Sequence, residues 1–255
     1  MLILICLTVM GVSLYKLITI TMDYKQGEKE YDILQSYTTE LAKDPVSDPD
    51  EEQEADTLEN ADESCPISVD FEHLKQINPD LVCWLYIPVL DISYPVVQGT
   101  DNDYYLHRTF EGTENFAGSL FVDAMVEQPF QDPHTIIYGH SMKNQTMFGK
   151  LKLLLPDDLY RKEPVFWILT VEGATEYQMI DIRFTEAGSS TYTLFDEADD
   201  SFVTYIEETK AQAGIENPNL PEITADCRLV TLSTCAAAEG TARLVVQGIA
   251  TEHRS

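Results

Sequence analysis

The chain has 255 residues, of which 44 are Asp or Glu and 16 are Lys or Arg, giving a formal net charge of −28. This excess of negative charge excludes the basic face that nucleic-acid binding requires. Hydrophobic residues make up 44% of the chain, which is typical of a globular protein, and the length predicts one domain of up to about 200 residues with appendages.

The N-terminal segment has no charged residue from Met1 to Tyr15, and its apolar and hydroxyl-bearing run continues, apart from Lys16, to Met22. About 20 such residues are needed for a helix to cross a bilayer. The sequence therefore predicts a transmembrane anchor at 1–22. An amphipathic helix or a core helix is the alternative interpretation.

The following segment, 23–65, is predicted to be an acidic, largely disordered spacer. Residues 44–63 contain ten acidic side chains and no aromatic one, which leaves too little apolar surface to offset the entropy of ordering. We expect this run to be solvated, and we infer no calcium site from it. The folded domain is then predicted to span 66–255.

Two helical patterns interrupt this domain, at Asp70 to Ile77 and at Asp199 to Ala213, where Phe202, Ile206 and either Thr209 or Lys210 share one face. A short helical turn is expected over 147–155. Eight strands with so few helices predict a mainly β fold, a closed or nearly closed barrel that buries its own edges. The predicted strands are VCWLYIP, ISYPVVQ, GSLFVD, HTIIYGH, PVFWILTV, TEYQMIDIRF, CRLVTLST and ARLVVQGIA.

The cysteines are odd in number and contain no C-x-x-C pair, so they indicate neither a zinc ribbon nor a dense disulfide framework, and at least one thiol should be free. Cys235 ends an apolar strand, and Arg243 opens the next one eight residues later. If these strands form a hairpin, the guanidinium lies beside the thiol, favours the thiolate and can bind an oxyanion. Taken singly, an inert buried thiol and a surface charge are the alternatives. The cysteines are Cys6, Cys65, Cys83, Cys227 and Cys235.

A nucleophilic cysteine also needs a group that moves protons, and histidine has a suitable pKa. His140 ends the apolar run TIIY and opens into a polar loop, which is where barrel proteins place functional side chains. The other histidines are expected in less suitable places: His253 in the tail, His73 on the first helix of the domain, His134 in a Pro-flanked turn and His107 in YYLHRTF. We identify no Asn or Asp that would orient His140 as in papain-like proteases.

Together, TLSTC ending at Cys235, Arg243 eight residues on, and YGHSMKNQTMF around His140 resemble the sortases, the cysteine transpeptidases of Gram-positive surfaces, and specifically class B. NPDLVCWLYIP, YPVVQGTDNDYYLHRTF and AGSLFVD support the resemblance, which covers about 67–251. It implies an eight-stranded sortase-type β-barrel with an N-terminal helical extension, a helix inserted before the cysteine strand, and a catalytic domain over 66–255.

The resemblance also implies the chemistry. Cys235 attacks the threonine carbonyl of a C-terminal sorting motif in a secreted protein, His140 protonates the departing amine, and Arg243 holds the carbonyl or its oxyanion. An amine of a peptidoglycan precursor or of a pilin resolves the thioacyl enzyme, with no metal or organic cofactor. The family pattern places Asn102, Leu106, Tyr138 and Ser233 in the substrate pocket.

The predicted location is the cell membrane, with a single membrane-spanning segment and the catalytic domain outside. Three alternatives remain open from the residues: a pilin-polymerising sortase, a thiol protease that only hydrolyses, and a degenerate, non-catalytic peptide-binding module.

Overall fold

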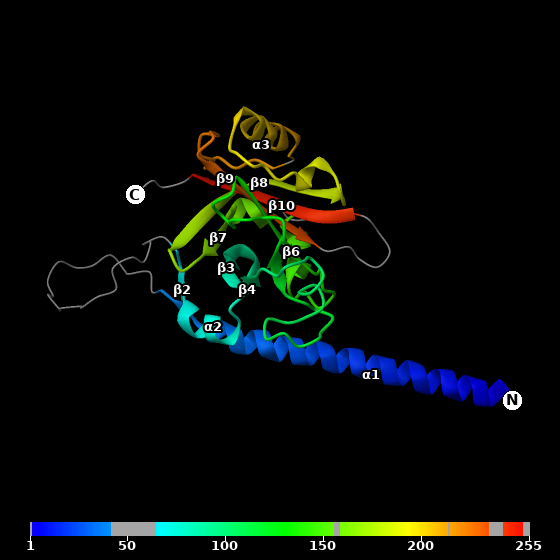
Figure 1. Ribbon diagram of the computed structural model, residues 1–255. Helices are drawn as coiled ribbons and strands as arrows, with labels where there is room; N and C mark the ends of the chain where they lie inside the picture. Colours follow the sequence, from blue (N-terminus) through cyan, green and yellow to red (C-terminus); the bar gives the residue numbers. More distant parts are fainter. Residues whose placement is uncertain (1, 42–64, 156–158, 214, 235–241, 252–255) are drawn as a thin grey trace, which may run out of the picture.

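The computed structural model describes residues 2–41, 65–155, 159–213, 215–234 and 242–251. Its centre is the predicted β-barrel, closed by eight strands that coincide with the eight apolar runs (Figure 1). Each strand alternates or is wholly apolar because its inner face meets the barrel core. In order around the barrel the strands are β10 (Ala242–Thr251), β8 (Ala174–Glu186), β7 (Val165–Leu169), β3 (Leu81–Ile87), β4 (Ile92–Val97), β5 (Leu120–Val122), β6 (His134–Gly139) and β9 (Cys227–Thr234).

The barrel is mixed, because β4 pairs with β5, and β6 with β9, in parallel, whereas the other neighbours are antiparallel. The β6–β9 register runs from His134 opposite Leu229 to Gly139 opposite Thr234. Parallel strands end at the same rim of a barrel. The chain therefore leaves β6 toward His140 and leaves β9 after Thr234 at one rim.

The core is built from large apolar side chains of strands on all sides of the barrel. Trp84 and Leu85 of β3, Phe166 of β7 and Val230 of β9 are fully buried. The one polar atom of the Trp84 side chain is satisfied, since Nε1 donates to Ser93 Oγ at 2.9 Å. Such packing gives a rigid scaffold on which the loops at the rims are held.

The inserted helix α3 (Asp200–Gln212) lies between the sixth and seventh barrel strands, β8 and β9, as predicted. Asp199 caps it by accepting from the N–H groups of Ser201 and Phe202. Its buried face consists of Phe202, Ile206 and Thr209, the residues that the helical spacing selected. This face packs outside the barrel on a second apolar cluster that includes Ile180, Leu229 and Ile249.

The other predicted helical segments are also present. Asp70 caps α2 (Phe71–Ile77), and its carboxylate accepts from the N–H of His73 at 3.1 Å. The turn predicted over 147–155 is the 3₁₀ helix η2 (Phe148–Leu154). Three further 3₁₀ turns are η1 (Pro88–Leu90), η3 (Leu159–Lys162) and η4 (Ser190–Tyr192).

The N-terminal helix α1 (Leu2–Gln35) corrects the predicted boundary of the spacer. Residues 23–35 continue the helix instead of forming the start of a disordered segment, because Gly27, Tyr31 and Leu34 lie on one face and are buried against the barrel. Strand β1 (Thr38–Glu40) then pairs with β2 (Ile67–Val69). The acidic run at 44–63, predicted to be solvated, lies outside the described residues.

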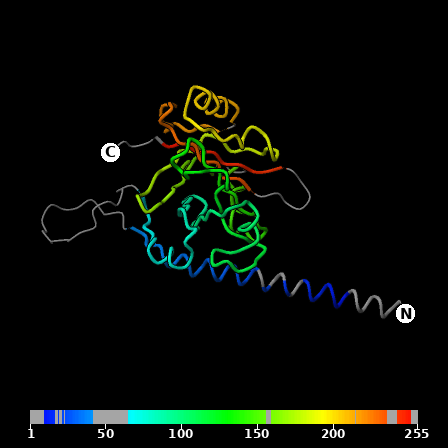
Figure 2. The backbone as a smooth tube through the Cα atoms, viewed as in Figure 1, coloured from blue at the N-terminus to red at the C-terminus, as the bar shows by residue number. Residues whose placement is uncertain are grey.

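In Figure 2 the C-terminal part of α1 lies on one side of the ring of strands and α3 on the opposite side. Among the residues that the structure describes, no helix is both long enough and apolar enough to span a bilayer. Many side chains of 1–22 lie outside the description, and the anchor predicted there stays a prediction.

Candidate active site

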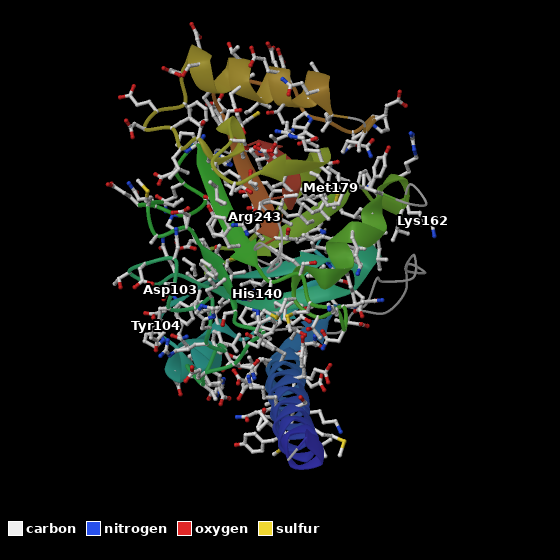
Figure 3. All side chains as sticks on the ribbon, turned by 90° about the vertical axis from the view of Figure 1, so that its right-hand side faces the viewer. Asp103, Tyr104, His140, Lys162, Met179 and Arg243 are labelled. Atoms are coloured by element: carbon white, nitrogen blue, oxygen red, sulfur yellow. The ribbon has the colours of Figure 1, made fainter. Side chains whose placement is uncertain are left out.

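A cavity of about 580 Å³ opens at the rim where β6 ends, and it holds most of the predicted site residues. Figure 3 looks onto this side of the molecule, with Arg243 above His140. None of the described lining residues is acidic, so the cavity differs from the strongly negative chain as a whole. The lining residues are Asn102, Leu106, His107, Phe121, Tyr138, His140, Ala187, Gly188, Tyr192 and Arg243.

His140 is held by a backbone carbonyl, not by the side chain of a third residue. Its Nε2 lies 2.8 Å from the Leu106 carbonyl oxygen. A carbonyl only accepts, so Nε2 carries the proton and donates it. Within the described part of the chain Nδ1 has no hydrogen-bond partner, which leaves this nitrogen available to move a proton.

The residue before His140 must be small. A Cβ on Gly139 would lie 2.3 Å from the Leu120 side chain and 2.8 Å from the Phe148 side chain. Without a side chain at this position, Leu120 of β5 and Phe148 of η2 close over the end of β6. Their packing fixes the backbone from which His140 projects.

The environment of His140 favours the neutral imidazole. Burial lowers its pKa below the usual range, the nearby His107 and Arg243 lower it further, and the hydrogen bond to Leu106 raises it. The ring also stacks on Phe116, with centroids 5.7 Å apart and an interplanar angle of 19°. An imidazolium formed here is therefore a stronger acid than a free histidine.

Arg243 is the second residue of β10 and pairs with Thr185 of β8, so a continuous ladder positions its backbone. Its side chain is half-buried at the cavity. No carboxylate of the described residues forms an ion pair with it. Its planar donors are thus directed to a cavity without a described counter-charge, where they can bind a carbonyl oxygen or an oxyanion.

One wall of the cavity is organised by Asp123, a buried carboxylate that the sequence did not single out. Its Oδ2 accepts from the Tyr138 hydroxyl at 2.9 Å, and its Oδ1 accepts from the N–H of Met125 at 2.9 Å. Asn102 joins this wall because its Oδ1 accepts from the N–H of Ala124 at 2.8 Å. The side chains of Tyr138 and Asn102 are therefore both held by the turn that begins at Asp123.

Ser233 stands behind the cavity instead of on it. Its side chain is fully buried, and its Oγ lies 2.9 Å from the Tyr192 hydroxyl oxygen. The Tyr192 ring in turn stacks on Tyr138, with centroids 6.3 Å apart at 20°. Ser233 thus supports a wall residue. Tyr192 itself lies in the η4 turn, where no sequence pattern distinguished it.

Five of the seven predicted site residues line the cavity: Asn102, Leu106, Tyr138, His140 and Arg243. Ser233 is placed behind it. Cys235 and the predicted contact between its thiol and Arg243 lie outside the described residues; Cys235 follows Thr234, the last described residue of β9. His107, which had no assigned role, is exposed and lines the same cavity.

His134 differs from its prediction, because it is the first residue of β6 and fully buried, not part of a turn. Its Nδ1 lies 2.7 Å from the Thr193 carbonyl oxygen and its Nε2 lies 2.7 Å from Thr231 Oγ1. His73 is on the first helix of the domain and exposed, as expected. His253 lies outside the described residues.

The chain matches the sortase family, described as Sortase domain, over residues 85–251. It is 36% identical over 180 residues to sortase B of Listeria monocytogenes, covering 69% of this chain and 71% of the relative. Among solved structures, sortase B from B. anthracis in complex with AAEK1 superposes with a TM-score of 0.71 at 27% identity, covering 92% of this chain and all of that one. A Staphylococcus aureus sortase B–substrate complex gives a TM-score of 0.65 at 30% identity, covering 72% and 85%.

Proposed function

Since this chain belongs to the sortase family, has class B relatives and is thus a cysteine transpeptidase of cell-wall sorting, we propose that Cys235, His140 and Arg243 carry out its reaction. The observation that supports this assignment is the shared cavity. His140 and Arg243 both line it, at the rim where β9 ends one residue before Cys235 in the chain.

In the first half of the reaction, Cys235 attacks the carbonyl carbon of the threonine in a C-terminal sorting motif. The thiol gives its proton to Nδ1 of His140, because Nε2 is already committed to the Leu106 carbonyl. The new S–C bond forms a tetrahedral oxyanion. As it collapses, the C–N bond breaks, Nδ1 returns the proton to the leaving amine, and a thioacyl enzyme remains.

In the second half, an acceptor amine attacks the thioacyl carbon, His140 removes a proton from it, and Cys235 leaves as the thiol. The lowered pKa of His140 suits both halves, because the imidazolium then gives up its proton readily. Arg243 stabilises the oxyanion in each half through its paired N–H donors. Both halves of the reaction as proposed proceed without a metal or an organic cofactor.

The substrate is proposed to be the sorting motif of a secreted protein, bound in extended form along the cavity. The walls combine the apolar surfaces of Leu106, Phe121 and Tyr192 with the polar edges of Asn102 and Tyr138. Such a mixture of apolar surface and few polar groups is typical of a site that binds a short peptide selectively. The acceptor is proposed to be an amine of a peptidoglycan precursor, with a pilin lysine as the alternative.

The proposal includes attachment of the chain to the cell membrane through 1–22, with the catalytic domain outside. The uncharged run from Met1 to Tyr15 supports it. The test is fractionation of cells that carry the full chain or a chain lacking 1–22. Recovery of both proteins in the soluble fraction would contradict this part of the proposal.

The central experiment combines the full chain with the C-terminal sorting regions of secreted proteins from the same genome, with and without hydroxylamine as a small amine acceptor. Mass spectrometry should find the thioacyl enzyme and, with the amine present, a hydroxamate product. Hydrolysis that is unaffected by the amine would instead identify a thiol protease. Failure of Cys235 to react with iodoacetamide in the folded protein would favour the non-catalytic peptide-binding module.

A further inference from the structure

The N-terminal helix α1 lies outside the region matched to the sortase domain, yet its last turns contact the segment that surrounds His140. The approach is close at Gly27, where a Cβ would lie 3.3 Å from the side-chain amide atoms of Asn115. One turn later, Glu30 Oε1 accepts from the N–H of Glu111 at 2.9 Å. Helix and segment 105–119 are therefore joined by packing and by a charge-assisted hydrogen bond.

Tyr31 makes the deepest contact of this helix. The side chain is buried, with 5% of its surface exposed, and its ring packs edge-on against Tyr94 at 5.3 Å. Its hydroxyl donates to the Gly118 carbonyl at 2.7 Å and lies 3.3 Å from Ser119 Oγ. A buried hydroxyl that is bonded in this way fixes the position of the Gly118 peptide group.

The Gly118 backbone in turn lies directly against the carbonyl that holds His140. Gly118 has φ +59°, and a Cβ there would lie 2.5 Å from the Leu106 oxygen and 2.8 Å from the Tyr105 oxygen. The adjacent N–H of Ser119 donates to the same Tyr105 carbonyl at 2.9 Å. The position of Gly118 thus determines where the Leu106 carbonyl lies, and this carbonyl accepts the Nε2 proton of His140.

A second line of contacts leads from the same helix to the face of the imidazole. The Tyr24 ring lies 6.3 Å from the Phe116 ring, and Phe116 stacks on His140. Phe116 is 61% exposed, so the barrel alone gives it little support. Figure 3 shows α1 below His140, on the side from which both lines approach.

We propose that α1 is part of the catalytic apparatus, with Tyr31 as a positioning residue that acts through Gly118 and Leu106 to set the tautomer and orientation of His140. Tyr24 is a second positioning residue, acting through Phe116. The inference rests on the proposed catalytic role of His140. Neither tyrosine touches the substrate or the reacting atoms.

The test is Tyr31→Phe in the full chain, which removes one hydroxyl and keeps the packed ring. Selective ¹⁵N labelling of histidine reports the tautomer and the pKa of His140, whose resonances are assigned with a His140→Gln sample. We expect a smaller share of the Nε2–H tautomer and a lower pKa, because the Leu106 hydrogen bond raises the pKa. Transfer of a sorting peptide to hydroxylamine should fall by about 10- to 100-fold in kcat with KM nearly unchanged.

Gln35→Ala is the matched control, since Gln35 ties the same helix to the Ser93 carbonyl of β4 and not to segment 105–119. It should alter neither the ¹⁵N signals nor kcat. Tyr24→Leu tests the second line and should lower kcat while the tautomer is kept. If Tyr31→Phe does not fold, as judged by circular dichroism, Tyr24→Leu decides the role of α1.

An unchanged His140 tautomer and pKa in folded Tyr31→Phe would overturn the route through Gly118, whatever the rate. Equal losses in Gln35→Ala and Tyr31→Phe would overturn it too, because helix docking alone would then explain the effect. Failure of the proposed function is seen separately, as full activity of His140→Ala. The NMR measurement does not depend on that outcome.

Discussion

A histidine and an arginine lie near each end of the β6–β9 strand pair, and their contacts differ between the two ends. At the start of the strands are His134, Cys227 and Arg228. At the other end are His140 and Arg243, and in the chain Cys235 follows β9. Residue type alone therefore does not distinguish the two ends.

The difference lies in what each side chain contacts. At the first end, both ring nitrogens of His134 are bonded, the Cys227 thiol is buried, and Arg228 Nη1 donates to the Cys227 carbonyl at 3.0 Å. At the second end, His140 uses one nitrogen on a carbonyl and faces a cavity that Arg243 shares. A histidine whose two ring nitrogens are both hydrogen-bonded stabilises the fold, whereas a histidine with one nitrogen unbonded can accept and donate a proton.

The largest expected contrast is between the two cysteines. Cys235→Ala should abolish transfer of the sorting peptide, a loss of at least about 10⁴-fold, because the attacking atom is gone. Cys227→Ala should keep transfer and lose only stability, since its buried thiol packs beneath α3. Mass spectrometry of the hydroxamate product and thermal unfolding measure the two effects. Transfer by folded Cys235→Ala would mean that the nucleophile is another residue.

The two histidines give the next contrast. His140→Ala should lower transfer by about 10²- to 10⁴-fold, because the leaving amine then loses the proton donor that the Leu106 carbonyl holds at the cavity. His134→Gln should transfer peptide at close to the wild-type rate and unfold at lower denaturant concentration. A similar loss of rate in both folded variants would remove the distinction between the two ends.

The arginines form the third pair. Arg243→Lys keeps the charge but replaces planar paired donors by a point charge, so transfer should fall by about 10²- to 10³-fold. Arg228→Lys should have little effect on the rate, because Arg228 donates to backbone carbonyls at the opposite end. If Arg243→Lys is nearly as active as the wild type, Arg243 acts through its charge alone.

The smallest effect is the pH dependence of stability. Burial lowers the pKa of His134 to about 4, below the value near 6.5 expected in the unfolded chain. Unfolding therefore takes up a proton between pH 6.5 and 4. The stability that comes from keeping His134 neutral is present above pH 6.5 and is lost as the pH falls through this window. The loss is at most about 1.4 kcal/mol per pH unit.

The pH dependence of stability that Asp181 contributes has the opposite sign to that of His134. Burial raises the pKa of the Asp181 carboxyl to about 6, so its protonation at lower pH stabilises the folded state. Its contribution is common to the wild type and to His134→Gln. The difference between their urea unfolding curves across this window therefore isolates His134. Identical pH dependence in the two proteins would show that His134 is not kept neutral by the fold.

The sequence predicts the barrel well because strand periodicity and apolar runs are local signals. All eight strands and the helix at 200–212 are found where the pattern places them. The predicted start of the spacer at residue 23 is wrong. The buried face of α1 at 23–35 includes Gly27 and Glu30, which are not apolar residues, so the apolar pattern does not indicate a buried helix there.

The site is predicted only in part, for a related reason. His140 and Arg243 are recognisable from their places at strand ends. The Leu106 carbonyl is a backbone group, and every residue has one, so no residue type reveals that it holds His140. Asp123 and Phe116 acquire their roles from contacts between elements distant in sequence, which a pattern along the chain does not contain.

The parallel pairing of β6 with β9 joins residues 134–139 to residues 229–234. Sheets built from segments so distant in sequence fold slowly, because the entropy of loop closure is lost before the contacts between the strands form. Until β6 and β9 pair, the segment before Cys235 and the segment before His140 are not held together. Under the proposed assignment, a newly made chain therefore has no acyl-transfer activity until these two strands have paired.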